Sequence, residues 1–183
     1  MTANATLGCY ASRRSLITQD RAAMSALSIQ PATPGDIPVI LQLIRELAEF
    51  ERLLDEAVAT EERLRTELFG ERPCAEVAMA RVDGEVVGFA LYFQNFSTFL
   101  GKRGIYLEDL FIRQPHRGRG YGEALLRHLA RICVERGYGR LEWSVLDWNQ
   151  RAIDFYKSLG AQPMNEWTTF RVTADALQKL GSQ

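Results

Sequence analysis

The residues best suited to chemistry lie in one stretch, which runs from Tyr106 to Leu126. It opens with an apolar, β-favouring run that holds two adjacent carboxylates, Glu108 and Asp109. A positioned carboxylate attracts an ammonium group and accepts its proton, directly or through water. That help matters because a primary amine with a pKa near 10.4 is neutral in only about one molecule in a thousand at pH 7.4. Glu108 is therefore a candidate general base, although loop N–H groups would also satisfy a purely structural carboxylate.

A glycine turn follows the same run and precedes a helical pattern, with Gly118, Gly120 and Gly122 in alternate positions. The first N–H groups of a helix have no intrahelical acceptor, and the helix dipole adds positive potential there. Glycine permits positive φ and lets a ligand's oxygens approach the main chain. The turn therefore predicts an anion site suited to phosphate, with Arg117 and Arg119 beside it. The alternative is a flexible surface loop before an ordinary helix.

Two longer nucleotide motifs do not apply to this turn. A Walker loop needs Gly-Lys-Ser/Thr, and a dinucleotide fingerprint needs the spacing G-x-G-x-x-G near the start of the chain. The segment Gly118-Arg-Gly-Tyr-Gly122 has neither pattern. The predicted phosphate site is therefore of another kind.

A second candidate for proton transfer is Tyr156, because a phenol with a reference pKa near 10 stays protonated at neutral pH and can donate to a leaving group. It follows Asn149, a predicted helix cap, by two helical turns, so both residues can share one side of the helix. Core packing beside Phe155 is the alternative. No Ser or Cys lies beside His116 or His128 in the manner of a nucleophile and its base, so no covalent intermediate is predicted.

The elements that must position these groups alternate between helical and strand periodicity. We expect helices over residues 33–51, 60–70, 122–137, 149–159 and 173–180, and strands over 75–82, 85–94, 104–113, 141–145 and 167–172. Asp83-Gly84 predicts a tight hairpin between the first two of these strands. Residues 95–103 are polar and aromatic and are expected to form a loop. The order predicts an α/β fold with a mixed central sheet flanked by helices.

Composition narrows the class of protein. The 183 residues fit one domain, and 46% hydrophobic with 25% charged residues is typical of soluble globular proteins. No apolar run is long enough for a membrane span, and a net charge of −1 argues against nucleic-acid binding. Cys9, Cys74 and Cys133 are isolated, which indicates neither disulfides nor a zinc site. We expect no metal and a reducing, cytoplasmic location.

The N-terminal residues 1–27 show no periodicity and are expected to form a flexible extension before a domain at residues 28–183. Ser12-Arg-Arg-Ser-Leu16 lacks the apolar region of an export signal. Met24 is a hypothetical natural start, because the first recognisable element follows it directly. The intact mass of the native protein would decide between Met24 and Met1.

Four motifs in this order resemble those of the GNAT family of acetyl-CoA-dependent N-acetyltransferases. They are Tyr106-Leu-Glu-Asp109, Arg117-x-x-Gly120-x-Gly122, Asp147-Trp-Asn-Gln-Arg151 and Phe155-Tyr-Lys-Ser-Leu-Gly-Ala161. The chain is similar in particular to the spermidine/spermine and thialysine acetyltransferase branch, over residues 29 to 180. The resemblance implies a single-domain GNAT fold, direct acetyl transfer to a primary amine in a ternary complex, and a homodimer.

The resemblance also implies roles for individual residues, with Glu108 as general base and Tyr156 as general acid. For the cofactor, it implies Leu110, Phe111 and Ile112 at the pantetheine arm, Arg117, Gly118, Arg119, Gly120, Tyr121, Gly122 and Glu123 at the pyrophosphate, and Asn149, Gln150, Arg151 and Ala152 at the far side. For the amine pocket, it implies Phe50, Glu51, Glu108, Glu142, Trp143, Ser144 and Glu166. Core burial is the alternative for Trp143 and Trp167.

The acceptor stays open between a diamine, a polyamine and a thialysine-like amino acid. Phe50 stands where polyamine acetyltransferases carry Tyr, and the loop from Ala161 to Trp167 is shorter than theirs. Acetylation of a protein N-terminus or of an aminoglycoside is an alternative activity. A non-catalytic acyl-CoA sensor is an alternative of another class, but a sensor needs no pair such as Glu108 and Tyr156.

Overall fold

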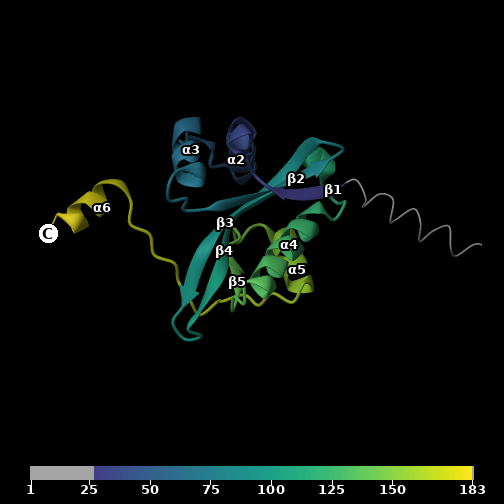
Figure 1. Ribbon diagram of the computed structural model, residues 1–183. Coiled ribbons are helices and arrows are strands. Elements are labelled where there is room, and N and C mark those ends of the chain that lie inside the picture. The colour runs from purple at the N-terminus through teal and green to yellow at the C-terminus, as the bar shows by residue number, and fades with distance from the viewer. Residues whose placement is uncertain (1–26, 183) are drawn as a thin grey trace, which may run out of the picture. The chain divides into compact units, whose positions relative to one another are not determined.

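The computed structural model describes residues 27–182, and their contacts divide the chain between Ser144 and Val145 into two compact units (Figure 1). The first unit contains the sheet and the second contains two helices. The predicted extension and the Met24 start lie outside the described residues, except for Leu27, which begins the first strand. None of the helices in the described part is long and apolar enough to cross a membrane.

A five-stranded mixed sheet forms the centre of the first unit, which confirms the predicted fold class. Its strands follow one another in chain order: β1 (Leu27–Pro31), β2 (Glu76–Val82), β3 (Glu85–Ser97), β4 (Lys102–Ile112) and β5 (Leu141–Trp143). The pairs from β1 to β4 are antiparallel, and β5 runs parallel to β4. Asp83 and Gly84 join β2 to β3 with φ of 51° and 86°, the positive values that a tight hairpin requires.

Local signals placed the helices of this unit correctly. The helix α2 (Ile37–Glu51) follows a short 3₁₀ turn, η1 (Pro34–Asp36), where Thr33 and Asp36 form a capping box. A second turn, η2 (Leu54–Glu56), leads to α3 (Glu61–Phe69), and the Thr60 hydroxyl accepts the N–H of Arg63 at 3.3 Å. The turn η3 (Gln114–His116) and the helix α4 (Tyr121–Glu135) follow β4.

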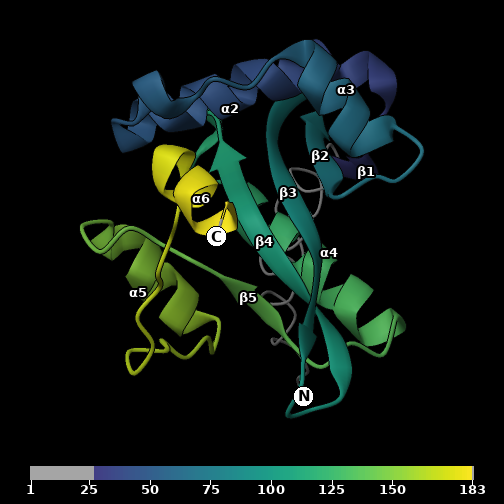
Figure 2. The ribbon, with the colours of Figure 1, turned by 90° about the vertical axis from the view of Figure 1, so that its left-hand side faces the viewer.

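Helices cover both faces of the sheet in Figures 1 and 2, with α2 and α3 on one face and α4 on the other. The core of the α2 face consists of Ile40, Leu43, Leu68, Val77, Met79, Phe89 and Phe111. The helix α4 buries Leu125, Leu126, Leu129 and Cys133. Cys133 is therefore a core residue, as its place on the apolar helix stripe predicts.

The second unit contains α5 (Gln150–Ser158) and α6 (Ala174–Gly181). The Asn149 side chain accepts the N–H of Ala152 at 3.3 Å, which confirms the predicted cap. Gly160, with φ of 89°, follows the end of α5 in the left-handed conformation that favours glycine.

Two strand predictions were wrong. Residues 167–172 form no strand, and Trp167 and Phe170 are exposed. Alternating apolar residues favour a strand only where a neighbour supplies the hydrogen-bond ladder, and no neighbour pairs with this segment within residues 27–182. Conversely, β3 continues through Asn95 to Ser97 and pairs with the start of β4, where a loop was expected. Pairing across the long hairpin supplies the backbone hydrogen bonds of this strand end, which its polar side chains did not predict.

Candidate active site

A β-bulge in β4 determines how the two adjacent carboxylates are presented. Opposite β3, Tyr92 pairs with Leu107 but the next residue, Leu91, pairs with Asp109, so Glu108 is the extra residue. Directly opposed residues share a face of the sheet. Asp109 therefore lies on the face of Leu91, which packs on the core beneath α2. The rule that neighbouring strand residues point to opposite faces does not hold across the bulge.

The two carboxylates differ in burial and in charge environment. Glu108 is exposed, whereas Asp109 is partly buried. Burial, followed by the nearby negative charges of Glu108 and Glu51, raises the pKa of Asp109 to about 6. Burial also raises the pKa of Glu51, the last residue of α2. Three carboxyl groups from two elements thus gather at the bulge and make this part of the unit attractive to a cation.

We expect Asp109→Asn to stabilise the protein at alkaline pH. An acid whose pKa is raised on folding favours the folded state only while it is protonated, so its ionisation costs stability as pH rises through about 6. The full cost corresponds to about 3 kcal/mol for a shift of about two pKa units. Urea unfolding should therefore show a gain in the free energy of unfolding at pH 8 that shrinks towards pH 4. Asp55→Asn, at an exposed site, is the control; a gain independent of pH would contradict the assignment.

The glycine turn has the geometry of an anion site. Gly118 and Gly120 have φ of 77° and 81°, and a Cβ added to either would meet no heavy atom within 4 Å. The first N–H of α4 with a backbone acceptor belongs to Ala124, which bonds to the carbonyl of Gly120 at 2.9 Å. Within residues 27–182, the N–H groups from Gly118 to Glu123 have no backbone acceptor. The turn thus offers a set of N–H groups at a positive helix end.

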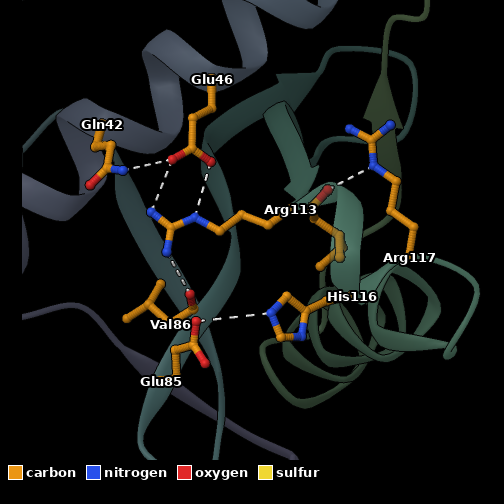
Figure 3. A network of polar contacts seen from close by, with 8 residues as sticks. Gln42, Glu46, Glu85, Val86, Arg113, His116 and Arg117 are labelled. Carbon is orange, nitrogen blue, oxygen red and sulfur yellow. Dashed lines mark hydrogen bonds and ion pairs between the residues drawn. The ribbon is translucent and has the colours of Figure 1, made fainter.

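An arginine network fixes the end of β4 just before this turn (Figure 3). The Arg113 guanidinium donates to both carboxylate oxygens of Glu46 at 3.0 Å and to the carbonyl of Val86 at 2.9 Å. Gln42 donates to the same carboxylate at 2.8 Å. No local pattern in the sequence predicts this role of Arg113, because its partner Glu46 on α2 is 67 residues away.

Arg117 bonds back to the strand that precedes it. Its Nε–H donates to the carbonyl of Ile112 at 2.8 Å, and Figure 3 shows the side chain extending towards this bond. The centre of its guanidinium lies 4.4 Å from the ring centroid of Phe50 and 5.3 Å from that of Phe111. Arg117 therefore links the turn to the last turn of α2.

One edge of β4 lacks a strand partner over the predicted pantetheine stretch. The strand β5 pairs only with Ile105 to Leu107 and ends where the bulge begins. In the described part of the chain, no strand continues this pairing along Glu108 to Ile112, and Figure 2 shows β5 leaving β4 there. The predicted residues Leu110, Phe111 and Ile112 follow the bulge on this strand. Their main chain can therefore bond to an extended amide-bearing ligand as a strand would.

The β5 residues predicted for the amine pocket have protein partners. One carboxylate oxygen of Glu142 accepts from the Asn95 side chain at 2.6 Å and lies 2.8 Å from Nε of Arg140. The hydroxyl groups of Ser144 and Tyr106 are 2.7 Å apart. Glu142, on β5, and Ser144, just after it, thus bond to side chains of β3 and β4, and their contact with an amine stays a prediction.

The remaining predicted residues belong to the second unit. Tyr156 lies on α5, half-buried, with its ring centroid 5.4 Å from that of Phe155. The predicted cofactor residues Asn149, Gln150, Arg151 and Ala152 form the start of this helix, and Glu166 lies in the exposed segment that follows. Across residues 27–182, no three His, Cys, Asp or Glu side chains are arranged to hold a metal ion.

Comparison with known proteins adds independent information. The model of the acetyltransferase (GNAT) family matches residues 41–161. A thialysine N-epsilon-acetyltransferase of Bos taurus is 40% identical, with 87% of this chain and 100% of the relative covered. An L-ornithine N5-acetyltransferase of Arabidopsis thaliana is 36% identical, with coverage of 83% and 86%. In a solved structure, an integron cassette protein from V. cholerae matches with a TM-score of 0.74 and 29% identity, covering 86% of this chain and 99% of that one.

Proposed function

Because this chain belongs to the GNAT family of N-acetyltransferases, we propose that it transfers acetyl from acetyl-CoA to a primary amine of a small cationic acceptor. One observation carries the proposal: a single strand, β4, bears a carboxylate cluster at its bulge, an unpartnered edge beyond it and an anion-binding turn at its end. That order matches the order of acetyl, pantetheine and pyrophosphate in acetyl-CoA.

In this proposal, main-chain groups hold the cofactor. The N–H groups from Gly118 to Glu123 bind the pyrophosphate, and Arg119 adds positive charge at the exposed side of the turn. Leu110, Phe111 and Ile112 offer backbone groups to the pantetheine arm. Bound acetyl-CoA supplies the acetyl thioester. This arrangement directs its reactive end towards Glu108, because the strand runs from the bulge to the turn.

The amine is activated by the carboxylates. Glu51, Glu108 and Asp109 attract the ammonium group, and the exposed Glu108 removes its proton directly or through water. The neutral amine then attacks the thioester carbonyl, the carbon–sulfur bond breaks, and the attacking nitrogen loses its second proton to solvent as the amide forms. Tyr156 gives its proton to the departing thiolate. Acetyl thus passes directly between the two substrates without a covalent enzyme intermediate.

We expect Gly120→Val to weaken CoA binding at least about tenfold, the equivalent of about one hydrogen bond to a charged group. Gly120 has φ of 81°, a conformation that a β-branched residue strains, and its Cβ would project into the open space of the turn. Titration calorimetry with CoA measures the effect. Gly137→Val is the matched control, because Gly137 has φ of 67° and open space at the other end of α4. Equal CoA affinities in the two variants would contradict the role of the turn.

The acceptor that we favour is an amino acid with a terminal side-chain amine, with diamines and polyamines as the wider class. The names of two relatives, a thialysine and an ornithine acetyltransferase, support this choice. The decisive experiment incubates purified protein and acetyl-CoA with thialysine, ornithine, diamines, polyamines, an aminoglycoside and an N-terminal peptide, and follows thiol release. Release with only the peptide or the aminoglycoside would favour those activities. Tight CoA binding with no release would favour a sensor.

We also propose a homodimer in a reducing, cytoplasmic compartment, with no nucleic-acid or membrane partner. The exposed apolar side chains of Trp167, Phe170 and Leu180 support association with a second copy of the chain. Cys74 and Cys133 are free thiols, which suits a reducing environment. Light scattering coupled to gel filtration would measure the mass in solution, and a monomer at all concentrations would contradict the dimer.

A further inference from the structure

We propose that Arg117 acts as a positioning residue: it fixes Phe50 at the end of α2 against the glycine turn and so aligns the acceptor side of the site with the cofactor side. The inference rests on the proposed function for its kinetic consequence, but its contacts can be tested without turnover. It differs from the phosphate-binding role that family resemblance implies for this residue.

Three contacts of Arg117 support this role. The Nε–H bond to the carbonyl of Ile112, at 2.8 Å, bridges the residues on either side of η3. The guanidinium then lies over the rings of Phe50 and Phe111, at 4.4 and 5.3 Å. A guanidinium over an aromatic face within about 6 Å is an attractive cation–π contact. All three contacts direct the side chain towards β4 and α2.

The contact with Arg117 adds to what holds Phe50 in place. Its side chain is 41% exposed, so burial alone does not fix its position. The helix ends one residue later, at Glu51, and the C-cap residue Arg52, with φ of 64°, turns the chain away. Glu51, between the two, is close enough to Asp109 to raise the pKa of that carboxyl. The end of α2 therefore contacts Arg117 through Phe50 and acts on the charge of Asp109 through Glu51.

The contact between Arg117 and Phe50 predicts that Arg117→Lys changes the amine KM more than the CoA affinity. A residue that binds phosphate by charge alone should tolerate lysine, because lysine keeps the positive charge and donors. A residue that works through a planar stack and a fixed Nε–H bond should not tolerate it. For Arg117→Lys we expect CoA affinity within about threefold of the wild type and a KM for the amine raised about tenfold, the scale of one cation–π contact.

A double-mutant cycle tests the connection. The proteins are wild type, Arg117→Lys, Phe50→Leu and the double variant, and the quantities are the unfolding equilibrium constant, the CoA dissociation constant and the amine KM. We expect the amine KM of the double variant to be raised no more than that of the worse single variant. The unfolding equilibrium constant of the double variant should differ by at least about threefold from the value that independent effects of the two substitutions would give. In a Phe50→Tyr background, which keeps an aromatic face, Arg117→Lys should still raise the KM. Arg119→Lys is the matched control on the same turn, with any effect confined to CoA affinity.

The outcomes are distinguishable. Additive unfolding and additive KM effects would overturn the inference while leaving acetyl transfer intact. A loss of CoA affinity beyond about tenfold in Arg117→Lys, with unchanged amine KM, would show a phosphate ligand instead and also overturn it. If the wild type acetylates no amine, the proposed function fails, but the unfolding cycle still decides whether Arg117 holds Phe50.

Discussion

Tyr156→Phe is expected to lower kcat by at least about a hundredfold, since a positioned general acid contributes about 10² to 10⁴ in rate. The variant keeps the aromatic ring and its contact with Phe155, whose centroid is 5.4 Å away, and it removes only the hydroxyl proton. The departing thiolate would then take its proton from water. CoA affinity should stay within about twofold, because in the proposed mechanism the phenol acts on the reacting sulfur and not on the nucleotide end.

Steady-state kinetics and calorimetry with CoA separate these two quantities. Tyr138→Phe is the matched control: it removes the same hydroxyl from a residue near the C-terminal end of α4, where the ring lies 6.0 Å from the Arg136 guanidinium. We expect its kcat to match that of the wild type. If Tyr156→Phe turned over at the wild-type rate, Tyr156 would have no part in the mechanism.

Glu108→Gln is the second variant with a large expected effect. It should lower kcat/KM about a hundredfold or more at pH 7, because glutamine keeps the shape of the side chain but cannot accept a proton. The lost activity should return as pH rises, since the neutral fraction of the amine increases tenfold per pH unit below its own pKa. The variant should therefore show a steeper pH profile than the wild type.

A pH series of kcat/KM from pH 6.5 to 9.5 measures this difference. Glu61→Gln, on the exposed start of α3, controls for the loss of one negative charge. A Glu108→Gln profile parallel to that of the wild type would point to Asp109 as the proton acceptor. Asp109→Asn in the same assay would test that assignment directly.

Most helix ends and the hairpin could be predicted because their signals are local. Thr33 and Asp36 satisfy each other's groups at the start of α2, and Asn149 caps α5 through a residue three positions on. Asp83-Gly84 sets its own turn. The glycine turn is also local, because its N–H groups depend on a helix that begins within the same segment. Each of these features depends on side chains within about four residues.

The features that prediction missed depend on partners that are distant in the chain. The bulge at Glu108 exists only relative to β3, so no window of β4 alone reveals it. Arg113 finds Glu46 across 67 residues. The strand expected at residues 167–172 has suitable alternation but no neighbour in the described structure. In each case the sequence contains the side chains but not the pairing that decides their role.

The extra residue in β4 also matters to anyone who wishes to re-engineer this protein. Because the register shifts at Glu108, Leu107 shares a side of the sheet with Leu110 and Ile112, and Asp109 has joined the other side. A combinatorial library that randomises every second codon along β4 would therefore change side chains on one face of the sheet before Glu108 and on the opposite face after it. Codon choice must change from odd to even positions at that residue if a single surface is to be remodelled.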